Sequence, residues 1–324
     1  ARRAHDIPPK RAMRASPRRG RALGAARRAP FARRGPRVIR LVTWNVQWFL
    51  GLDGRVDPAR VIAHARSLAD VDVLCVQELA EHFPDPRPEG NADGDQIAML
   101  AELLPGYTVV HGVGTDHPGD DGRRRRFGNA IASRLPVRQV RRHALPWPAD
   151  PGVASMPRVA VEAVVAAPSG LVRIVTTHLE YWSRTQRSQQ VRRLREIHAE
   201  GHAHARLGSA ERDDGGPFHR LPHPFATIVT GDFNLGPDDP DHAQMLAPFP
   251  DGASRLHDAW RLVHGDRAQP PTFCVHEPYS PDSKPIACDF VFVSEELARR
   301  VSSIEIDSAT RLSDHQPVVV TIEG

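Results

Sequence analysis

The sequence has few cysteines and no long apolar run, and each of these absences excludes a class of protein. Three cysteines in 324 residues do not match the disulfide framework of a small secreted domain or a zinc-binding motif. No segment approaches the roughly 20 apolar residues of a membrane-spanning helix, so we expect no transmembrane segment. Apolar residues make up 40% of the chain, which is enough for a large hydrophobic core.

The position of each cysteine suggests its state. Cys75 lies within an apolar run and is expected to be a small residue of the core. For Cys274 and Cys288, a disulfide bridge is the alternative to free thiols, and it applies only if the protein is exported.

Acidic residues are almost absent from the first 37 residues, and this uneven distribution hides the charge of the rest. Residues 1–37 hold 13 of the 43 Lys and Arg residues and a single acid, Asp6. Residues 38–324 therefore carry 30 basic and 38 acidic residues, a net charge of −8 in a chain whose total is +4. An acidic body attracts polyanionic DNA poorly, which argues against long, tight DNA binding.

Residues 1–37 are rich in Arg, Ala, Pro and Gly without apolar periodicity, which predicts a disordered basic tail or extension. The alternatives are an arm that touches nucleic acid or anionic lipid, and an export or organelle signal. Arg27 and Arg28 interrupt the only mildly apolar stretch and argue against a signal peptide. We expect a cytoplasmic monomer without a stable protein partner, with export through this segment as the alternative.

From residue 38 onward, apolar segments alternate with polar ones, which predicts a domain of strands and helices. Helical spacing predicts helices at residues 58–69, 96–104 and 186–198. Apolar runs bounded by turn residues predict strands at residues 38–44, 71–76, 107–111, 128–133, 159–166, 171–178, 226–230, 290–293, 304–306 and 318–322. Residues 83–95, 112–126 and 201–224 are expected to be long loops. We expect the exposed end of the third helix to carry His198, His202 and His204, and metal binding by these histidines is the alternative.

Several predicted strands end in the same kinds of polar residue, and this repetition is the most informative pattern in the chain. The strand ends carry Asn45, Gln77-Glu78, His178, Asp232 with Asn234, and, before the last strand, Asp314-His315. A packed α/β core gathers such strand ends along one rim. Carboxylate and amide oxygens suit hard cations such as Mg²⁺ or Mn²⁺ rather than structural zinc. The pattern predicts an oxygen-rich metal site with two imidazoles.

Taken in order, these segments resemble the motifs of the endonuclease/exonuclease/phosphatase superfamily. The matching segments are Trp44-Asn45, Gln77-Glu78, Gly128-Asn129-Ala130-Ile131, Thr177-His178-Leu179, Gly231-Asp232-Phe233-Asn234, Asp289-Phe290-Val291-Phe292 and Ser313-Asp314-His315. The resemblance covers residues 38–324 and implies a single catalytic domain. The implied fold is a four-layered αββα sandwich of two packed, mixed, mainly antiparallel sheets, with the site at one rim.

The resemblance also implies metal-dependent hydrolysis of a phosphoester, with Mg²⁺ or Mn²⁺ as cofactor. Glu78 resembles the main metal carboxylate, with Asn45 beside it. Asp314 resembles a second carboxylate on the metal side, which also orients His315. His315 in turn resembles the residue that activates the attacking water or holds the phosphate.

The remaining roles follow from the same resemblance. His178 resembles a second catalytic histidine near the leaving group or the phosphate. Asp232 resembles the carboxylate near the nucleophile, and Asn234 an amide that orients the phosphate. The supporting residues are Asn129, Arg158 and Asp289.

One position departs from the family pattern. Many relatives have a basic residue two places before the aspartate at 289, where this chain has Ala287. The change removes a cation from the substrate side, and Lys284 in the preceding loop is a candidate substitute.

The segment Thr177-His178-Leu179-Glu180 resembles the deoxyribonuclease, sphingomyelinase and phosphatase branches more than the abasic-site repair branch. We expect hydrolysis of a phosphodiester, by a nuclease or phosphodiesterase, with nucleic acid among the candidate substrates. A phosphatase or a sphingomyelinase-like phospholipase is the alternative. An alternative of another class is a nucleic-acid- or membrane-binding protein that acts through its basic tail.

Two further groups of residues are candidates for substrate contacts. The arginines at residues 123–126 are candidates to meet phosphates, and a solvated charged loop is the alternative. Trp147, Tyr181 and Trp182 are candidates to stack on a base or lie against lipid, with packing as the alternative.

Overall fold

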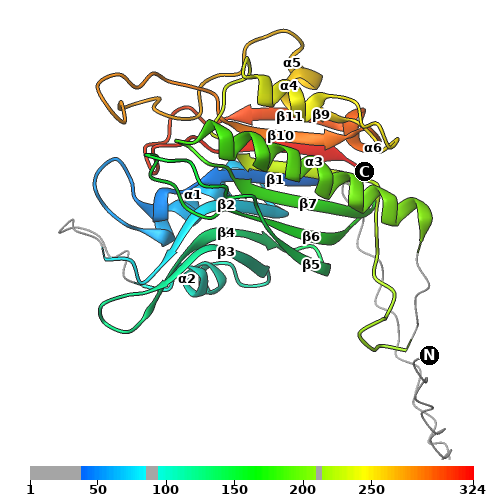
Figure 1. Ribbon diagram of the computed structural model, residues 1–324, viewed down its shortest axis with the longest axis horizontal. Helices are drawn as coiled ribbons and strands as arrows, with labels where there is room; N and C mark the ends of the chain where they lie inside the picture. Colours follow the sequence, from blue (N-terminus) through cyan, green and yellow to red (C-terminus); the bar gives the residue numbers. More distant parts are fainter. Residues whose placement is uncertain (1–37, 85–93, 209–213) are drawn as a thin grey trace, which may run out of the picture. The chain divides into compact units, whose positions relative to one another are not determined.

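The computed structural model describes residues 38–84, 94–208 and 214–324, which form two packed six-stranded sheets (Figure 1). Residues 1–37, and with them the predictions for the basic tail, lie outside the described residues. Within the described part of the chain, no helix has the length and apolar character needed to span a bilayer.

The first sheet has one parallel pair at its centre and antiparallel neighbours elsewhere. Its order is β11 (Val301–Ile306), β12 (Val318–Glu323), β1 (Val38–Asn45), β2 (Val73–Glu81), β4 (Arg124–Ser133) and β3 (Thr108–Pro118). β1 and β2 form the parallel pair. A helix connects them, as a parallel pair requires.

The second sheet repeats this plan. Its order is β5 (Val137–Ala144), β6 (Val159–Ala167), β7 (Gly170–His178), β8 (Thr227–Asp232), β10 (Asp289–Ser294) and β9 (Leu256–Asp258). β7 and β8 form its parallel pair, and the other neighbours are antiparallel. The mixed, mainly antiparallel character of both sheets confirms the predicted class.

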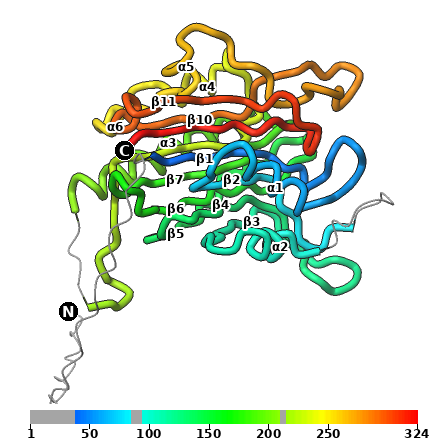
Figure 2. Tube along the Cα trace, turned by 180° about the vertical axis from the view of Figure 1, so that it is seen from behind, coloured from blue at the N-terminus to red at the C-terminus, as the bar shows by residue number. Residues whose placement is uncertain are grey.

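Helices cover the outer face of each sheet. α1 (Pro58–Leu68) and α2 (Gln96–Leu103) pack on the first sheet, and α3 (Arg184–Leu207) and α4 (Pro240–Leu246) pack on the second. Figure 1 shows α3 along the strands, and Figure 2 shows the same elements from behind. The remaining short helices are η1 (Gln47–Phe49), α5 (Ala259–His264) and α6 (Glu295–Ala298).

The alternation of side chains along the strands builds three apolar layers. In β1, Leu41 joins the core between the sheets, whereas Trp44 packs against the α1 side. In β10, Val291 faces the core between the sheets, and Phe290 and Phe292 face α3. Since successive residues of a strand point to opposite faces, each inner strand serves two layers. The four-layered αββα sandwich is confirmed.

Three sequence-based expectations are wrong in detail. The predicted loop at residues 112–126 is largely strand, because β3 and β4 extend into a long hairpin whose arginines pair with acids across the strands. Residues 201–207 continue helix α3 instead of forming a loop. His198 lies on the buried face of α3 and not at an exposed helix end, and it hydrogen-bonds to Ser254 O at 2.8 Å.

The cysteines follow the simpler expectation. Cys75 is fully buried in the core between the sheets, as predicted. Cys274 and Cys288 are buried free thiols, so the structure contains no bridge between them.

Candidate active site

The two parallel strand pairings end at the same rim of the sandwich, and four polar residues lie there. Asn45, the last residue of β1, stands opposite Gln77, where the pairing of β1 with β2 stops. His178 stands opposite Asp232 at the ends of β7 and β8. Parallel neighbours must finish at the same edge, so this topology brings polar residues from both sheets to one place.

Two further segments reach the same rim from the opposite direction. β10 begins at Asp289, which pairs with the last residue of β8. The segment that precedes β12 carries Asp314 and His315. Its position is fixed to the first sheet because Ser313 Oγ donates a hydrogen bond to Asn45 O at 2.7 Å.

A bulge in β2 turns Glu78 toward the rim. The β2–β4 register shifts between Val76 and Leu79, and Glu78 has a left-handed φ of 63°. A bulge of this kind re-aims a side chain that a regular strand would direct elsewhere. Asn45 Nδ2 then donates to Glu78 Oε1 at 3.0 Å.

The end of β8 depends on a glycine. Gly231 has a φ of 134°, and a Cβ there would lie 2.0 Å from Thr177 O of the neighbouring strand. This close approach keeps β7 and β8 together where they deliver their polar residues. Beyond it, Asn234 N donates to Asp232 Oδ1 at 2.9 Å, and Asn234 Nδ2 donates to Leu179 O at 2.9 Å.

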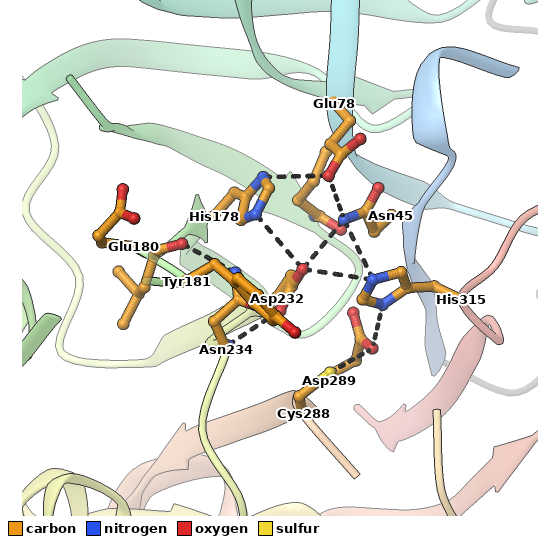
Figure 3. A network of polar contacts seen from close by, with 12 residues as sticks. Asn45, Glu78, His178, Glu180, Tyr181, Asp232, Asn234, Cys288, Asp289 and His315 are labelled. Carbon is orange, nitrogen blue, oxygen red and sulfur yellow. Dashed lines mark hydrogen bonds and ion pairs between the residues drawn. The ribbon is translucent and has the colours of Figure 1, made fainter. Parts of the chain in front are cut away.

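Asp232 is the centre of the polar cluster shown in Figure 3. Its Oδ2 accepts a hydrogen bond from Asn45 Nδ2 at 2.9 Å. The same oxygen lies 3.4 Å from His178 Nε2 and 3.6 Å from His315 Nε2. One buried carboxylate therefore stands between the two imidazoles.

Asp289, and not Asp314, orients His315. His315 Nδ1 hydrogen-bonds to Asp289 Oδ2 at 2.9 Å, whereas no hydrogen bond joins Asp314 to the imidazole. Thr272 Oγ1 donates to the same Asp289 oxygen at 2.6 Å, and the Phe273 ring packs on the imidazole with centroids 4.6 Å apart. The expectation that Asp314 orients His315 is corrected, because the strand start at β10 places Asp289 behind the ring.

The two histidines have opposite electrostatic environments. Burial disfavours the charged form of His315, but the negative charges of Asp289 and Asp232 outweigh burial and hold its pKa well above the usual range. Burial and the nearby charge of Arg158 lower the pKa of His178 to about 3. These environments favour the protonated form of His315 and the neutral form of His178.

Two carboxylates at the rim fit a divalent cation. Burial, followed by the negative charge of Asp314, raises the pKa of Glu78 to about 7. Burial also raises the pKa of Asp314. Such raised values are expected where acidic groups crowd together without a counter-charge, and a bound cation would supply one. Asn45 here bridges carboxylates through its amide nitrogen, while its oxygen accepts from Gln47 N at 3.1 Å.

A second group of donor atoms fits a cation less well. Atoms of Asp232, Cys288 and His315 lie within 4.8 Å of one another and are fully buried. Burial and the charge of Asp289 raise the pKa of the Cys288 thiol well above its usual range, which opposes formation of the thiolate that binds metal. Glu78 and Asp314 are therefore the better candidates.

Arg158 and Asn129 occupy different places relative to the cluster. Arg158 Nε donates to Glu180 Oε2 at 3.3 Å, while its buried Nη1 has no hydrogen-bond partner among the described residues. Asn129 Nδ2 donates to Val159 O at 3.0 Å and so connects the first sheet to the second. Arg158 faces the cavity, and Asn129 supports the sandwich behind it.

A cavity of about 570 Å³ opens over this cluster. It is lined by Glu78, Arg158, His178, Asp232, Asn234, Asp314 and His315, whereas Asn45, Asn129 and Asp289 stand behind its wall. The rest of the lining is mainly apolar and aromatic. Lys284, the candidate substitute for the missing cation, lies with Asp282 in an adjoining pocket of about 380 Å³.

Sequence reasoning assigned no role in the site to three polar residues that hold it together. Gln77 bridges the sheets, since its Nε2 donates to Oγ1 of Thr43 and of Thr176. Glu180 is fully buried against Arg158, and its place two residues after His178 was a usable signal. Thr272, the donor to Asp289, follows two prolines in an irregular segment and gives no signal in the sequence.

The comparisons with known proteins agree with this geometry. A model of the Endonuclease/Exonuclease/phosphatase family matches residues 42–315. No match to the chain was found among curated proteins. Among solved structures, the chain is similar to an endonuclease/exonuclease/phosphatase from Beutenbergia cavernae, at 24% identity over 89% of this chain and 72% of that chain, with a TM-score of 0.62.

Two other similar structures have different described substrates or products. TDP2 from D. rerio, solved with a single-stranded DNA product, is 19% identical over 89% of this chain and 99% of that chain, with a TM-score of 0.57. A mannosyl-6-phosphatase from Bacteroides thetaiotaomicron is 20% identical over 87% of this chain and 98% of that chain, with a TM-score of 0.58. At these identities the likeness concerns the fold.

Proposed function

Because the chain belongs to the endonuclease/exonuclease/phosphatase family, whose members are hydrolases of phosphoester bonds, we propose that it hydrolyses phosphodiesters with Mg²⁺ or Mn²⁺. The observation that carries the proposal is the buried Asp232 carboxylate between His178 and His315, in one cavity with Glu78 and Asp314. These groups line one cavity that is large enough for a substrate.

Glu78 and Asp314 are the residues that would hold the cation, with Asn45 positioned between carboxylates behind them. A bound cation would neutralise the negative charge that develops on the phosphate oxygens. Both carboxylates are ligands of the kind that Mg²⁺ and Mn²⁺ prefer.

The protein's own groups can perform the proton transfers. Asp232 Oδ2 is placed to accept the proton of an attacking water, since it lies at the rim between the two imidazoles. His315, held by Asp289, can donate a hydrogen bond to a phosphate oxygen. Arg158 can offer its unpartnered Nη1 to the phosphate, and His178 completes the wall on that side.

The charge of the cavity favours a diester over a monoester. A diester carries one negative charge, whereas a phosphomonoester carries about 1.5 to 2 at neutral pH. Among the described residues that line the cavity, Arg158 is the one Lys or Arg, and Glu180 already pairs with it at 3.3 Å. A monoester remains the second candidate, because the fold also occurs in a mannosyl-6-phosphatase.

A panel of chromogenic esters tests the proposal. The purified protein is stripped of metal with EDTA and assayed on bis-p-nitrophenyl phosphate and p-nitrophenyl phosphate, before and after addition of Mg²⁺ or Mn²⁺. We expect diester turnover that depends on added metal and is lost in Glu78→Gln. Full turnover after exhaustive chelation contradicts the metal requirement, and monoester turnover far above diester turnover supports the phosphatase.

We also propose that residues 1–37 are not needed for turnover and that the protein acts as a cytoplasmic monomer. Deletion of this segment should leave small-diester hydrolysis unchanged and remove most salt-sensitive binding of duplex DNA. Tight, tail-independent duplex binding, or a dimer in light scattering, contradicts these proposals.

A further inference from the structure

Four aromatic side chains form one wall of the active-site cavity. This aromatic wall consists of Tyr181, Trp182, Phe273 and Tyr279, all of which line the cavity. The ring centroid of Tyr181 lies 4.6 Å from that of Trp182 and 6.1 Å from that of Tyr279. The ring centroids of Phe273 and Tyr279 are also 6.1 Å apart. The wall therefore behaves as a connected cluster and not as scattered apolar residues.

The aromatic wall continues directly into the polar cluster. The Phe273 ring packs on His315, and Tyr181 lies three residues after His178. A substrate group that binds on this wall therefore lies close to the polar cluster, where the scissile phosphate is expected to bind. The catalytic groups and the wall share one cavity of about 570 Å³, which falls in the size range of small-molecule sites and is far larger than a phosphate alone.

Two rings of the wall are exposed at the mouth of the cavity. Trp182 is 60% exposed and Tyr279 is 58% exposed. Exposed aromatic rings beside a catalytic centre lose contact with water when a flat ligand stacks on them. Trp147 is exposed to a similar degree, at 51%, but does not line the cavity.

The surroundings offer little for a long polyanion. Among the described lining residues, Arg158 is the one Lys or Arg, and it is paired with Glu180. The four arginines at residues 123–126 lie in ion pairs with Asp121, Asp116, Asp120 and Glu81. Recognition must therefore come mainly from the ring contacts beside a single phosphate and not from a track of phosphate contacts.

Building on the proposed function, we propose that the cavity takes a phosphodiester carrying one flat ring system of nucleobase size, which packs against the rings of Tyr181, Trp182 and Tyr279. These residues set the specificity for the group next to the scissile phosphate. The substrate class is a small or terminal nucleoside phosphodiester, and an internal site of duplex DNA is a poor match.

The test compares two diesters with the same leaving group. Thymidine 5′-(p-nitrophenyl phosphate) and methyl p-nitrophenyl phosphate both release p-nitrophenolate, so their ratio of kcat/KM isolates the contribution of the nucleoside. We expect the full-length protein to prefer the thymidine ester. Trp182→Ala and Tyr279→Ala should each reduce that ratio by roughly tenfold, the usual scale of base–aromatic stacking, chiefly through KM.

Trp147→Ala is the matched control, because it removes an equally exposed tryptophan outside the cavity and should leave the ratio unchanged. An equal kcat/KM for the two esters in the unmodified protein overturns the inference while the proposed function stands. A preference for octyl p-nitrophenyl phosphate over the thymidine ester also overturns it, in favour of an alkyl chain.

A binding measurement separates failure of this inference from failure of the proposed function. Thymidine 5′-monophosphate is titrated into the protein with EDTA present, and its Kd is compared between the unmodified protein and Trp182→Ala. If neither ester is hydrolysed, the proposed function fails, and a Kd that weakens by roughly tenfold in Trp182→Ala still supports the pocket. An unchanged Kd contradicts it.

Discussion

Strand β7 carries two buried polar clusters, one near each end, and they differ in how completely their atoms are paired. His178 belongs to the rim cluster around Asp232, and Arg173, roughly 17 Å earlier on the strand, belongs to a cluster under α3. We call the second group, made of Glu162, Arg173 and His198, the α3 cluster. Both contain charges and a histidine that are buried from water.

In the α3 cluster, every side-chain nitrogen of Arg173 has an acceptor. Nε donates to Thr227 Oγ1 at 3.3 Å, Nη1 donates to Ile197 O at 3.1 Å, and Nη2 reaches His198 at 3.1 Å. The other nitrogen of His198 hydrogen-bonds to Ser254 O. We call this cluster closed, because protein atoms supply the hydrogen-bond partners of Arg173 and His198.

The rim cluster is open in the sense that some of its buried polar atoms have no hydrogen-bond partner in the described part of the protein. Arg158 Nη1, His178 Nδ1 and Asp289 Oδ1 are buried and have no hydrogen-bond partner among the described residues. An unpaired buried polar group costs about 1–3 kcal/mol, so such groups persist where something other than the protein completes them. Pairing therefore distinguishes the α3 cluster, which the protein completes, from the rim cluster, which we propose binds a ligand, although both look alike by burial and composition.

The largest expected effect is on catalysis at the rim. His178→Ala and His315→Ala should each lower kcat on a diester by about two to four orders of magnitude, because each removes an acid–base or positioning group. Their combined effect should be less than multiplicative if both act on one transition state. Steady-state kinetics with thermal unfolding of the same samples measures both sides of the comparison.

His257→Ala is the matched control for the histidines. His257 pairs with Glu295 away from the cavity, so its loss should leave kcat unchanged. Full activity in the His178→Ala/His315→Ala double variant would remove both residues from the mechanism.

Arg173→Ala should have the reverse profile. The change leaves several buried acceptors unpaired, whereas Glu162 keeps its contacts with His143 and Arg141, so we expect a loss of about 1–3 kcal/mol in the free energy of unfolding. The kcat of the folded fraction should be unchanged. Urea unfolding monitored by circular dichroism gives the stability, and assays well below Tm give the activity.

Arg193→Ala on the outer face of α3 is the control for this loss. Arg193 pairs with Glu196 and Glu200 at the surface, where such pairs contribute about 0–1 kcal/mol. Equal destabilisation by the two arginine variants contradicts a special role for the α3 cluster.

The difference between the clusters also explains what the sequence could predict. The rim residues interrupt apolar strands at their ends, so Asn45, Glu78, His178 and Asp232 were visible as a repeated pattern. The parallel pairs then account for their convergence, and family resemblance supplied the four-layered fold.

The sequence did not predict the α3 cluster, and the reason is physical. Glu162 and Arg173 lie inside strands, where a single polar residue in an apolar run is the usual sign of a solvent-facing position. His198 has the spacing of a polar helix residue. The three residues of the α3 cluster are buried only because α3 packs on the second sheet. Packing between segments that are distant in the sequence cannot be predicted from local sequence patterns.

Long-range partners were missed for the same reason. The contact of Asp289 with His315 joins residues 26 positions apart, and the sequence instead suggested the adjacent Asp314. Strand β5 was not predicted because its three arginines mask the apolar alternation of Val137 and Val140. Strand β3 runs farther than its apolar run because Asp116 pairs with Arg124 on β4.

The third prediction concerns the pH dependence of the α3 cluster. Burial and the charge of Arg173 lower the pKa of His198 from 6.5 to about 4. Between these values the unfolded chain binds a proton that the folded protein does not, so stability falls as the pH drops from about 6.5 to about 4. The full effect is about 3 kcal/mol, because one pKa unit corresponds to about 1.4 kcal/mol.

His198→Gln isolates this contribution from the rim groups, which also titrate in this range. Urea unfolding at pH 7.5 and pH 5 gives the pH dependence for both proteins. The variant should lose less stability on acidification than the unmodified protein, and an identical loss in both contradicts the assignment to His198.

The smallest effect, and the sharpest, concerns Gly201 on α3. A Cβ at this position would lie 1.5 Å from Arg173 Nη1, so Gly201→Ala must displace a guanidinium whose hydrogen bonds are all made. We expect a loss of about 1–2 kcal/mol in the free energy of unfolding from the displaced hydrogen bonds. In the Arg173→Ala background the space is empty, and the same change should stabilise by about 0.5–1 kcal/mol, because alanine favours the helix interior over glycine. A double-mutant cycle in urea measures this reversal of sign, which follows from a direct contact between the two positions. If Gly201→Ala has the same sign in both backgrounds, α3 does not close over Arg173 as the structure has it, and the distinction between a closed and an open buried cluster loses its clearest support.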